Sequence, residues 1–260
     1  MDYQNLLVSD RGAVRTITIN RPDKLNALNL RTLQELAAAF RAAREDASVR
    51  VVVLAGAGEK AFVAGADIAE LATLSPVDAQ AFSRAGQTLM RGIERTGKPV
   101  IARIQGFALG GGMELAMSCH LRIASEKARL GQPEINLGVI PGFGGTQRLT
   151  RLAGRSAALE LCLLGTTVDA ARGQALGVLN RVVPAERLDE EIDAVANQLA
   201  SAAPVALAGI LDAVTVGADC PMDAALEFET QAFALCCSTD DMREGTQAFL
   251  QKRKAEFRGR

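Results

Sequence analysis

The chain has 260 residues, of which 48% are hydrophobic and 23% charged, a composition typical of a folded globular protein. Its 29 Lys and Arg residues nearly balance 30 Asp and Glu residues, so there is no basic field to hold a phosphate backbone. Because aromatic residues are only 4% and Trp is missing, stacking of bases or sugars is also disfavoured, and we expect no nucleic acid among the partners.

The first two thirds of the chain alternate between strand and helix patterns. Apolar or alternating runs that predict strands lie at 14–19, 49–54, 99–104 and 121–124. Apolar residues at helical spacing, or apolar stretches of helical length, lie at 33–40, 76–93 and 113–119. Strands separated by helices predict crossover connections and a layered α/β core.

From Ser156 onward Ala, Leu and Glu dominate, which predicts helices and few strands. We expect these helices near 156–164, 188–201, 203–216, 222–236 and 240–254. The chain therefore divides into a core domain of residues 1–195 and a helical region of residues 196–260. Leu226, Phe233 and Leu235 make partly apolar faces that could pack on the core or on another copy of the chain.

A glycine run, Gly110-Gly111-Gly112, follows the strand at 99–104 and precedes a helix. It leaves unpaired backbone N–H groups at a helix N-terminus, where partial positive charge suits a phosphate or an oxyanion. The nucleotide alternative is weak, since neither GxGxxG with a downstream ribose acid nor GxxxxGK[ST] occurs. That the glycines serve only close helix packing remains an open alternative.

A second glycine-containing segment, residues 61–68, follows the strand at 49–54 and could supply another free amide. Two amides from separate loops that meet at one carbonyl oxygen would stabilise an enolate, each by about 3 kcal/mol. Taken alone, this segment reads as an ordinary loop.

Two glutamates stand in apolar surroundings. Glu134 lies in the glycine- and proline-rich segment 130–146, where poor solvation should raise the pKa of its carboxyl group. Glu114 lies one turn into an apolar helix beside Met113 and Leu115. Either glutamate alone could equally be a buried ion-pair partner or a helix-start acid.

Together these segments are far more specific. AFVAGADI at 61–68, KPVIARIQGFALGGGMELAM at 98–117 and ARLGQPEINLGVIPGFGGTQRL at 128–149 resemble the enoyl-CoA hydratase (crotonase) family, and the likeness covers essentially the full chain. The resemblance implies an α/β fold built as a crotonase-like spiral of ββα units. It also implies a C-terminal helical trimerisation region and assembly as a trimer or a hexamer, the dimer of trimers.

The resemblance also implies roles for individual residues. Glu114 and Glu134 would be the catalytic acids, and the amides of Ala66 and Gly111 would form the oxyanion hole. The residues expected to bind acyl-CoA are Ala64, Ala66, Asp67, Ile68, Ala69 and Gly111. Because hydratases keep both acids and other branches usually do not, the pair favours reversible addition of water to trans-2-enoyl-CoA in fatty acid β-oxidation or related degradation. No metal and no cofactor is expected, since coenzyme A is part of the substrate.

The chain departs from the family pattern at two places. Several hydratases carry a lysine that reaches coenzyme A where this chain has Ala69, so Lys24 and Lys252 become candidate substitutes. The lone histidine, His120, stands where relatives often have Asp, and we assign it a structural rather than a catalytic role.

Several alternatives stay open. Within the family these are double-bond isomerisation and hydration of a branched substrate of the methylglutaconyl-CoA type. An RNA-binding or non-catalytic scaffold relative is disfavoured, because both acids remain and the basic residues at 252–260 predict a solvated tail. The five cysteines have no metal-ligand spacing and predict reduced core thiols. With no signal or membrane-spanning pattern in the sequence, we expect a cytoplasmic protein with no membrane partner.

Overall fold

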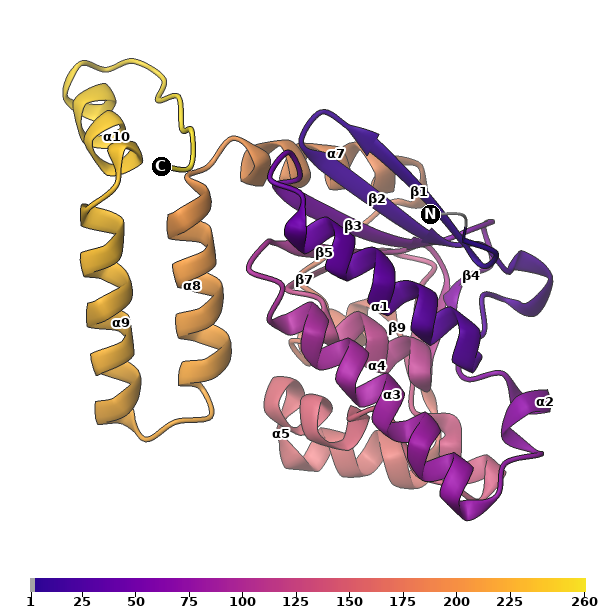
Figure 1. Ribbon diagram of the computed structural model, residues 1–260. Coiled ribbons are helices and arrows are strands. Elements are labelled where there is room, and N and C mark those ends of the chain that lie inside the picture. Colours follow the sequence, from indigo (N-terminus) through magenta and orange to yellow (C-terminus); the bar gives the residue numbers. More distant parts are fainter. Residues whose placement is uncertain (1–2) are drawn as a thin grey trace.

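The computed structural model describes residues 3–260 and forms two β-sheets with helices packed around them (Figure 1). The larger sheet, in strand order, contains β1 (Leu6–Arg11), β2 (Val14–Ile19), β3 (Val51–Gly56), β5 (Val100–Ile104), β7 (Leu121–Ser125) and β10 (Arg181–Val183). The smaller sheet contains β4 (Ala61–Val63), β6 (Phe107–Leu109), β8 (Arg129–Gly131) and β9 (Thr167–Asp169). Apart from the antiparallel pairs β1–β2 and β8–β9, neighbouring strands are parallel, as crossover connections require.

The helices are α1 (Leu30–Glu45), α2 (Ile68–Leu71), α3 (Pro76–Glu94), α4 (Gly111–Ser118), α5 (Gly145–Leu164), α6 (Ala170–Ala175), α7 (Leu188–Ala200), α8 (Pro204–Gly217), α9 (Met222–Cys237) and α10 (Asp240–Leu250). Shorter 3-10 turns are η1 (Pro22–Lys24), η2 (Pro133–Leu137) and η3 (Ala185–Arg187). Side-chain caps begin the two long helices of the N-terminal half, because Asn29 accepts from the Thr32 amide and Ser75 from the Asp78 amide.

Strand β3 shows why the larger sheet has a near-continuous apolar run. Val51 and Val53 pack with Leu188 and Ile192 of α7 on one face. The intervening residues, such as Leu54, pack in the main core with α1 and α3 on the other face. Both faces of β3 are thus covered by helices, so every position on the strand is buried.

A repeated unit builds the spiral and prepares the functional site. A strand of the larger sheet is followed by a short strand of the smaller sheet and then by a helix, as in β5, β6 and α4. The same order recurs in β3, β4 and α2, and in β7, β8 and η2. Because β4, β6 and β8 pair in parallel, their carboxyl ends lie at one edge of the smaller sheet.

The C-terminal helices lie to one side of the sheets (Figure 1). Helices α8 and α9 run beside each other as a hairpin, and along their described residues no side chain is buried. Their exposed apolar side chains include Ile210, Val214, Phe233 and Leu235. The hairpin thus presents an exposed apolar face along its described residues.

The basic side chains of residues 252–260 are exposed, as the predicted solvated tail requires, but the backbone of this segment is folded. The buried carboxylate of Asp241 accepts hydrogen bonds from the amides of Arg258 and Gly259, at 2.6 and 2.8 Å. Arg50, just before β3, donates to the Phe257 carbonyl at 2.9 Å. The segment after α10 is therefore folded back on α10 and tied to the core.

The α/β class predicted from the sequence is confirmed, and so are the predicted strands and helices, with shifts of a few residues at their ends. Two helix limits were wrong: the helix expected at 156–164 begins at Gly145, and the last helix ends at Leu250 rather than 254. Gly154 has non-helical angles (φ 81°, ψ 162°) and splits α5, so the sequence pattern revealed only its second half.

Within residues 3–260, no single helix is long and apolar enough to cross a membrane. One pair, Ala185–Ala200 with Pro204–Gly217, reaches such a length and hydropathy only when joined across a bend of 107°.

Candidate active site

Three loops meet at the edge where β4, β6 and β8 end. They carry Ala66 after β4, Gly111 after β6 and Glu134 after β8. A cavity of about 790 Å³ opens at this edge and is lined by these three residues, by Glu114, and by apolar side chains of α2, α3 and the loop before α5. The parallel pairing of three short strands thus brings together the four residues that the sequence singled out.

The backbone N–H of Ala66 is left free by the way its segment pairs. Ala66 forms an isolated parallel bridge with Leu28, in which the Leu28 amide donates to Gly65 and the Leu28 carbonyl accepts from Asp67. Successive N–H groups of an extended chain point to opposite sides, so that of Ala66 points away from Leu28. Within residues 3–260 no protein acceptor binds it.

The second free amide is that of Gly111, the first residue of α4. Its N–H is one of the orphan donors at a helix start, and no acceptor in the described chain binds it. A Cβ atom on Gly111 would lie 3.5 Å from the Ala66 nitrogen, so the two loops touch at this point. Two donors from different loops therefore stand side by side in one cavity.

The glycine run also serves close packing, as the alternative interpretation held. A Cβ atom on Gly112 would lie 2.0 Å from the carbonyl oxygen of Val63, so α4 can contact β4 only with glycine there. In this run Gly112 allows the close packing of α4 on β4, and its neighbour Gly111 supplies the free amide.

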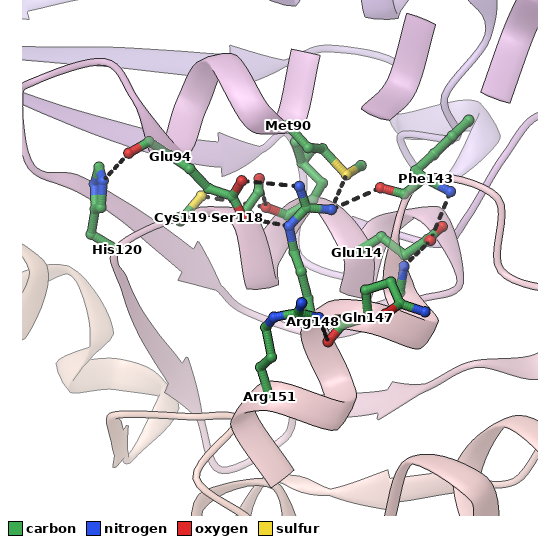
Figure 2. Close-up of polar contacts among 12 residues, drawn as sticks. Met90, Glu94, Glu114, Ser118, Cys119, His120, Phe143, Gln147, Arg148 and Arg151 are labelled. Atoms are coloured by element: carbon green, nitrogen blue, oxygen red, sulfur yellow. Dashed lines mark hydrogen bonds and ion pairs between the residues drawn. The ribbon is translucent and has the colours of Figure 1, made fainter. Parts of the chain in front are cut away.

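Glu114 is 1% exposed and projects from α4 toward the turn before α5. One carboxylate oxygen, Oε1, accepts the amides of Phe143 at 2.8 Å and Gly145 at 2.6 Å (Figure 2). Burial, followed by the charge of Glu134, raises the pKa of Glu114 to about 7, although the two amides and Arg148 oppose the rise. The carboxyl group thus titrates well above the usual range of a glutamate.

Glu134 is half-buried on η2, and burial raises the pKa of its carboxyl group to about 7. The fully buried side-chain amide of Gln132 lies beside it. With its NH2 group turned toward Glu134, this amide stands 3.0 Å from Oε1 and 3.1 Å from Oε2. Two acids with near-neutral pKa values therefore line the same cavity as the two free amides.

The segment expected to bind acyl-CoA forms the wall beside Ala66. Ala64 and Ile68 line the cavity, whereas Asp67 is occupied elsewhere. Its carboxylate pairs with Arg21 at 2.8 Å and caps α2 by accepting the Ala69 amide at 3.2 Å. The Arg21 guanidinium therefore holds the pKa of Asp67 below its usual range.

The two candidate lysines lie outside the cavity. Lys24 is exposed on η1, next to Leu25, whose carbonyl accepts the Ala64 amide at 3.0 Å. Lys252 follows α10, which Figure 1 shows on the opposite side of the molecule from α2. Of the two, only Lys24 lies near this chain's own cavity.

His120 is held by structural hydrogen bonds (Figure 2). Its Nδ1 accepts the Val100 amide at 2.9 Å, so the proton is on Nε2, which donates to the carbonyl of Glu94 at 3.2 Å. Burial lowers the pKa of His120. Both ring nitrogens are used in packing α3 and α4 against β5, which agrees with the structural role expected from the sequence.

The cysteines are all free, and Cys119 is buried as predicted, but Cys220 is exposed rather than part of the core. Within residues 3–260, no group of three or more His, Cys, Asp or Glu side chains could hold a metal ion.

Three residues near the acids were missed by sequence reasoning: Gln132, Phe143 and Arg148. Phe143 is 3% exposed, lines the cavity and packs edge-on against Phe82, with 5.1 Å between ring centroids. Arg148 donates to the Phe143 carbonyl at 2.8 Å. All three lie within the motif at 128–149, but their contacts depend on how that segment turns around Glu114.

Comparison with known proteins gives a consistent result over the whole chain. The family model described as enoyl-CoA hydratase/isomerase matches residues 9–260. A short-chain-enoyl-CoA hydratase of Clostridium acetobutylicum is 44% identical over 256 residues, covering 98% of each chain. A crotonyl-CoA hydratase of Syntrophomonas wolfei is 43% identical over 257 residues, covering 99% of each.

Solved structures agree with this comparison. An enoyl-CoA hydratase of Bacillus anthracis superposes with a TM-score of 0.96 at 40% identity, covering 99% of this chain and 100% of that one. A structure from Geobacillus kaustophilus, described as an enoyl-CoA hydratase subunit, has a TM-score of 0.95 at 42% identity and full coverage of both chains. The predicted crotonase-like fold is thereby confirmed.

Proposed function

Because this chain belongs to the enoyl-CoA hydratase/isomerase family, we propose that it is a hydro-lyase that reversibly adds water to trans-2-enoyl-CoA and forms 3-hydroxyacyl-CoA. The observation that carries the proposal is the pair of acids, Glu114 and Glu134, whose pKa values are both raised to about 7 in one cavity. A group that gives or takes a proton works best when its pKa is near the working pH.

Glu114 acts as the general base. One of its carboxylate oxygens is occupied by two backbone amides, and within residues 3–260 no side chain or amide binds the other. That free oxygen orients a water molecule and accepts its proton as the water oxygen attacks the β carbon of the substrate.

Glu134 acts as the general acid and delivers a proton to the α carbon. The substrate thus gains OH at the β carbon and H at the α carbon, while the proton taken by Glu114 replaces the one lost by Glu134. Two acids whose pKa values are both raised in one cavity suit this exchange, because one can give a proton while the other accepts one.

The thioester oxygen accepts hydrogen bonds from the amides of Ala66 and Gly111 as negative charge develops on it. Donors that are already oriented and hold no other acceptor stabilise the enolate without reorganisation, each by about 3 kcal/mol. The thioester and these amides supply the activation, so the proposal includes no metal and no separate cofactor.

The coenzyme A moiety lies along the segment from Ala64 to Ala69, and Lys24 is the lysine of this chain nearest to that segment. A contact from Lys252 would have to come from a second copy of the chain. Assembly as a trimer or a dimer of trimers through the helical region 196–260 would also cover the exposed apolar side chains of α8 and α9.

We further propose a preference for short acyl chains. The Phe143 ring lies against the position of Gly111, where a Cβ atom would be 3.1 Å from Cε2 of the ring. Packed against Phe82, this ring forms the part of the cavity wall beside Gly111. Two of the relatives are named for short-chain or crotonyl-CoA substrates, which supports this proposal.

Incubation with crotonyl-CoA tests the proposed function. We expect the enoyl absorbance to fall and a product heavier by one water molecule to appear, identified as 3-hydroxybutyryl-CoA by mass spectrometry. Double-bond migration without uptake of water would instead assign the protein to the isomerase branch. A panel of linear and branched enoyl-CoA substrates with acyl chains of roughly four to sixteen carbons then defines the preferred substrate.

A further inference from the structure

The base proposed above is held by a turn rather than by another side chain. The amides of Phe143 and Gly145 both donate to Oε1 of Glu114, at 2.8 and 2.6 Å. These donors fix the position of Oε1, and within residues 3–260 no group binds the other carboxylate oxygen. The position of the base therefore depends on what holds the turn from 143 to 145.

Arg148, one turn into α5, holds that turn from behind. Its Nη1 donates to the Phe143 carbonyl at 2.8 Å and lies 3.9 Å from Sδ of Met90. Gly144 has φ 102°, and a Cβ atom there would lie 2.4 Å from Nη1 of Arg148. The turn is thus folded directly onto the guanidinium group.

Arg148 is fixed in its turn by Glu94 at the end of α3 (Figure 2). The pair is a two-point fork, with Nε to Oε1 at 2.5 Å and Nη2 to Oε2 at 3.1 Å. Only 15% of the Arg148 side chain and 24% of the Glu94 side chain are exposed, so solvent screens the pair weakly. The Glu94 carbonyl also accepts the Nε2 proton of His120, which anchors the end of α3.

We propose that Arg148, clamped by Glu94, is a positioning residue that sets the geometry and the protonation of Glu114 through the turn from Phe143 to Gly145. The proposal rests on the function proposed above and deepens it. Arg148 acts in two ways. Held by its two hydrogen bonds to Glu94, it keeps the turn, and so the two amides, at the Glu114 carboxylate. Its positive charge also favours the ionised form of Glu114.

Other charged or titratable groups also face Glu114. Glu134 on η2 disfavours ionisation of the base, whereas Arg148 on α5 favours it. The pKa of the Cys162 thiol, also on α5, is raised by burial and then by the charges of Glu134 and Glu114. Arg148 is therefore the one cation among the described groups that acts on this acid.

Substitutions at position 148 separate the two actions. We expect Arg148→Gln to lower kcat by roughly tenfold or more with KM nearly unchanged, because a small displacement of a base is costly. We also expect the acid limb of the pH–kcat/KM profile to move up by about half a unit or more, since a nearby positive charge is lost. Arg148→Lys keeps the charge but not the fork, so kcat should fall while the limb stays near that of the wild type.

Arg151 provides the matched control. It lies one turn further along α5, where it donates to Gln147 (Figure 2). Its guanidinium group also pairs with Asp219 at 2.9 Å. Arg151→Gln removes the same charge from the same helix without a contact to the 143–145 turn, and should leave both kcat and the pH profile unchanged.

A readout without turnover separates this proposal from the proposed function. The Glu114 carboxyl carbon can be titrated by 13C NMR, with its signal assigned by its loss in Glu114→Gln. The pKa should be higher in Arg148→Gln than in the wild type and unchanged in Arg151→Gln. An inactive wild-type protein would refute hydration of the substrates tested but would not alter this comparison.

The proposal is overturned if Arg148→Gln keeps the wild-type kcat and titration, or if kcat falls with no shift of the limb or of the NMR titration. If Arg148→Gln does not fold, the near-isosteric Glu94→Gln decides the question. Glu94→Gln should lower kcat, and the acid limb of its pH–kcat/KM profile should lie at the wild-type pH or below it. An unchanged kcat in Glu94→Gln would also reject the proposal.

Discussion

A Cβ atom on Gly110 would lie 2.8 Å from the Oε1 atom of Glu134. Gly110 has φ 51° and ψ −125°, a backbone conformation that side chains rarely allow, and it precedes the first residue of α4. The same glycine therefore permits the sharp entry into α4 and the approach of the Glu134 carboxyl to the cavity.

We predict that Gly110→Ala lowers kcat for crotonyl-CoA by about a hundredfold or more, because the new methyl group displaces Glu134 and strains the backbone. The matched control is Gly92→Ala on α3, where a Cβ atom meets no atom within 4 Å. Steady-state kinetics of the two variants measure the effect. Equal activity of both would show that the approach at Gly110 is not needed.

Removing either acid should separate chemistry from binding. We predict that Glu114→Gln and Glu134→Gln each lower hydration by at least about a hundredfold, the scale of a general base or acid. Because Gln keeps the size of the side chain, affinity for a saturated acyl-CoA measured by calorimetry should stay close to the wild type. Near-normal turnover in either variant removes that residue from the mechanism.

The pH dependence follows from the two raised pKa values. Hydration requires Glu114 ionised and Glu134 protonated, and both groups titrate at about 7. We therefore predict a bell-shaped profile of kcat/KM with its maximum near neutral pH. In Glu134→Gln, the basic limb should be absent from the residual activity, since no group at position 134 can then lose a proton. A flat profile from pH 5 to 9, the range that brackets these values, contradicts the assignment.

Glu114 should also link stability to pH. Burial, then the Glu134 charge, raises its folded pKa from 4.5 to about 7, so the folded protein holds this proton more tightly than the unfolded chain. Its contribution to stability is complete below pH 4.5 and is lost as the pH rises through about 7. We predict that the melting temperature of Glu114→Gln minus that of the wild type increases as the pH rises from 4.5 to about 7, and then stays constant. A constant difference measured by calorimetry would refute the linkage.

The fold could be predicted from the sequence where packing leaves a periodic pattern. Strand β3 is buried on both faces and α3 buries one stripe, and both patterns are visible in the residue order. The strands β4, β6 and β8 have three residues each, which is too short to show such a pattern. Their pairing partners also lie far along the chain. The edge strand β1 is also largely exposed, so its apolar signal is weak.

The candidate site was predictable to a similar extent. Glu114 and Glu134 are acids in apolar surroundings, a contrast that the sequence shows directly. The positions of Phe143 and Arg148 were not predictable, because they depend on a backbone amide and a backbone carbonyl rather than on side-chain type. Only the turn around Glu114 brings these atoms together, and a local pattern cannot encode that turn.

Phe143 leads to a prediction about substrate choice. Its buried ring lines the cavity and packs on Phe82, and a Cβ atom on Gly86 would come within 2.2 Å of it, so the ring has little room to move. We predict that Phe143→Ala raises kcat/KM for octenoyl-CoA relative to crotonyl-CoA by about tenfold or more, since each accommodated methylene contributes to binding. Competition between the two substrates, followed by mass spectrometry, measures this ratio directly.

Phe40→Ala is the control for this prediction. Phe40 is 4% exposed against 3% for Phe143, but it belongs to α1 and does not line this cavity in the described chain. Both substitutions should destabilise the protein by roughly 3 kcal/mol, because each removes a buried ring. A ratio of two substrates is independent of the folded fraction, so only a change specific to Phe143 counts as a change in specificity. An equal ratio in both variants would mean that another part of the cavity limits the acyl chain.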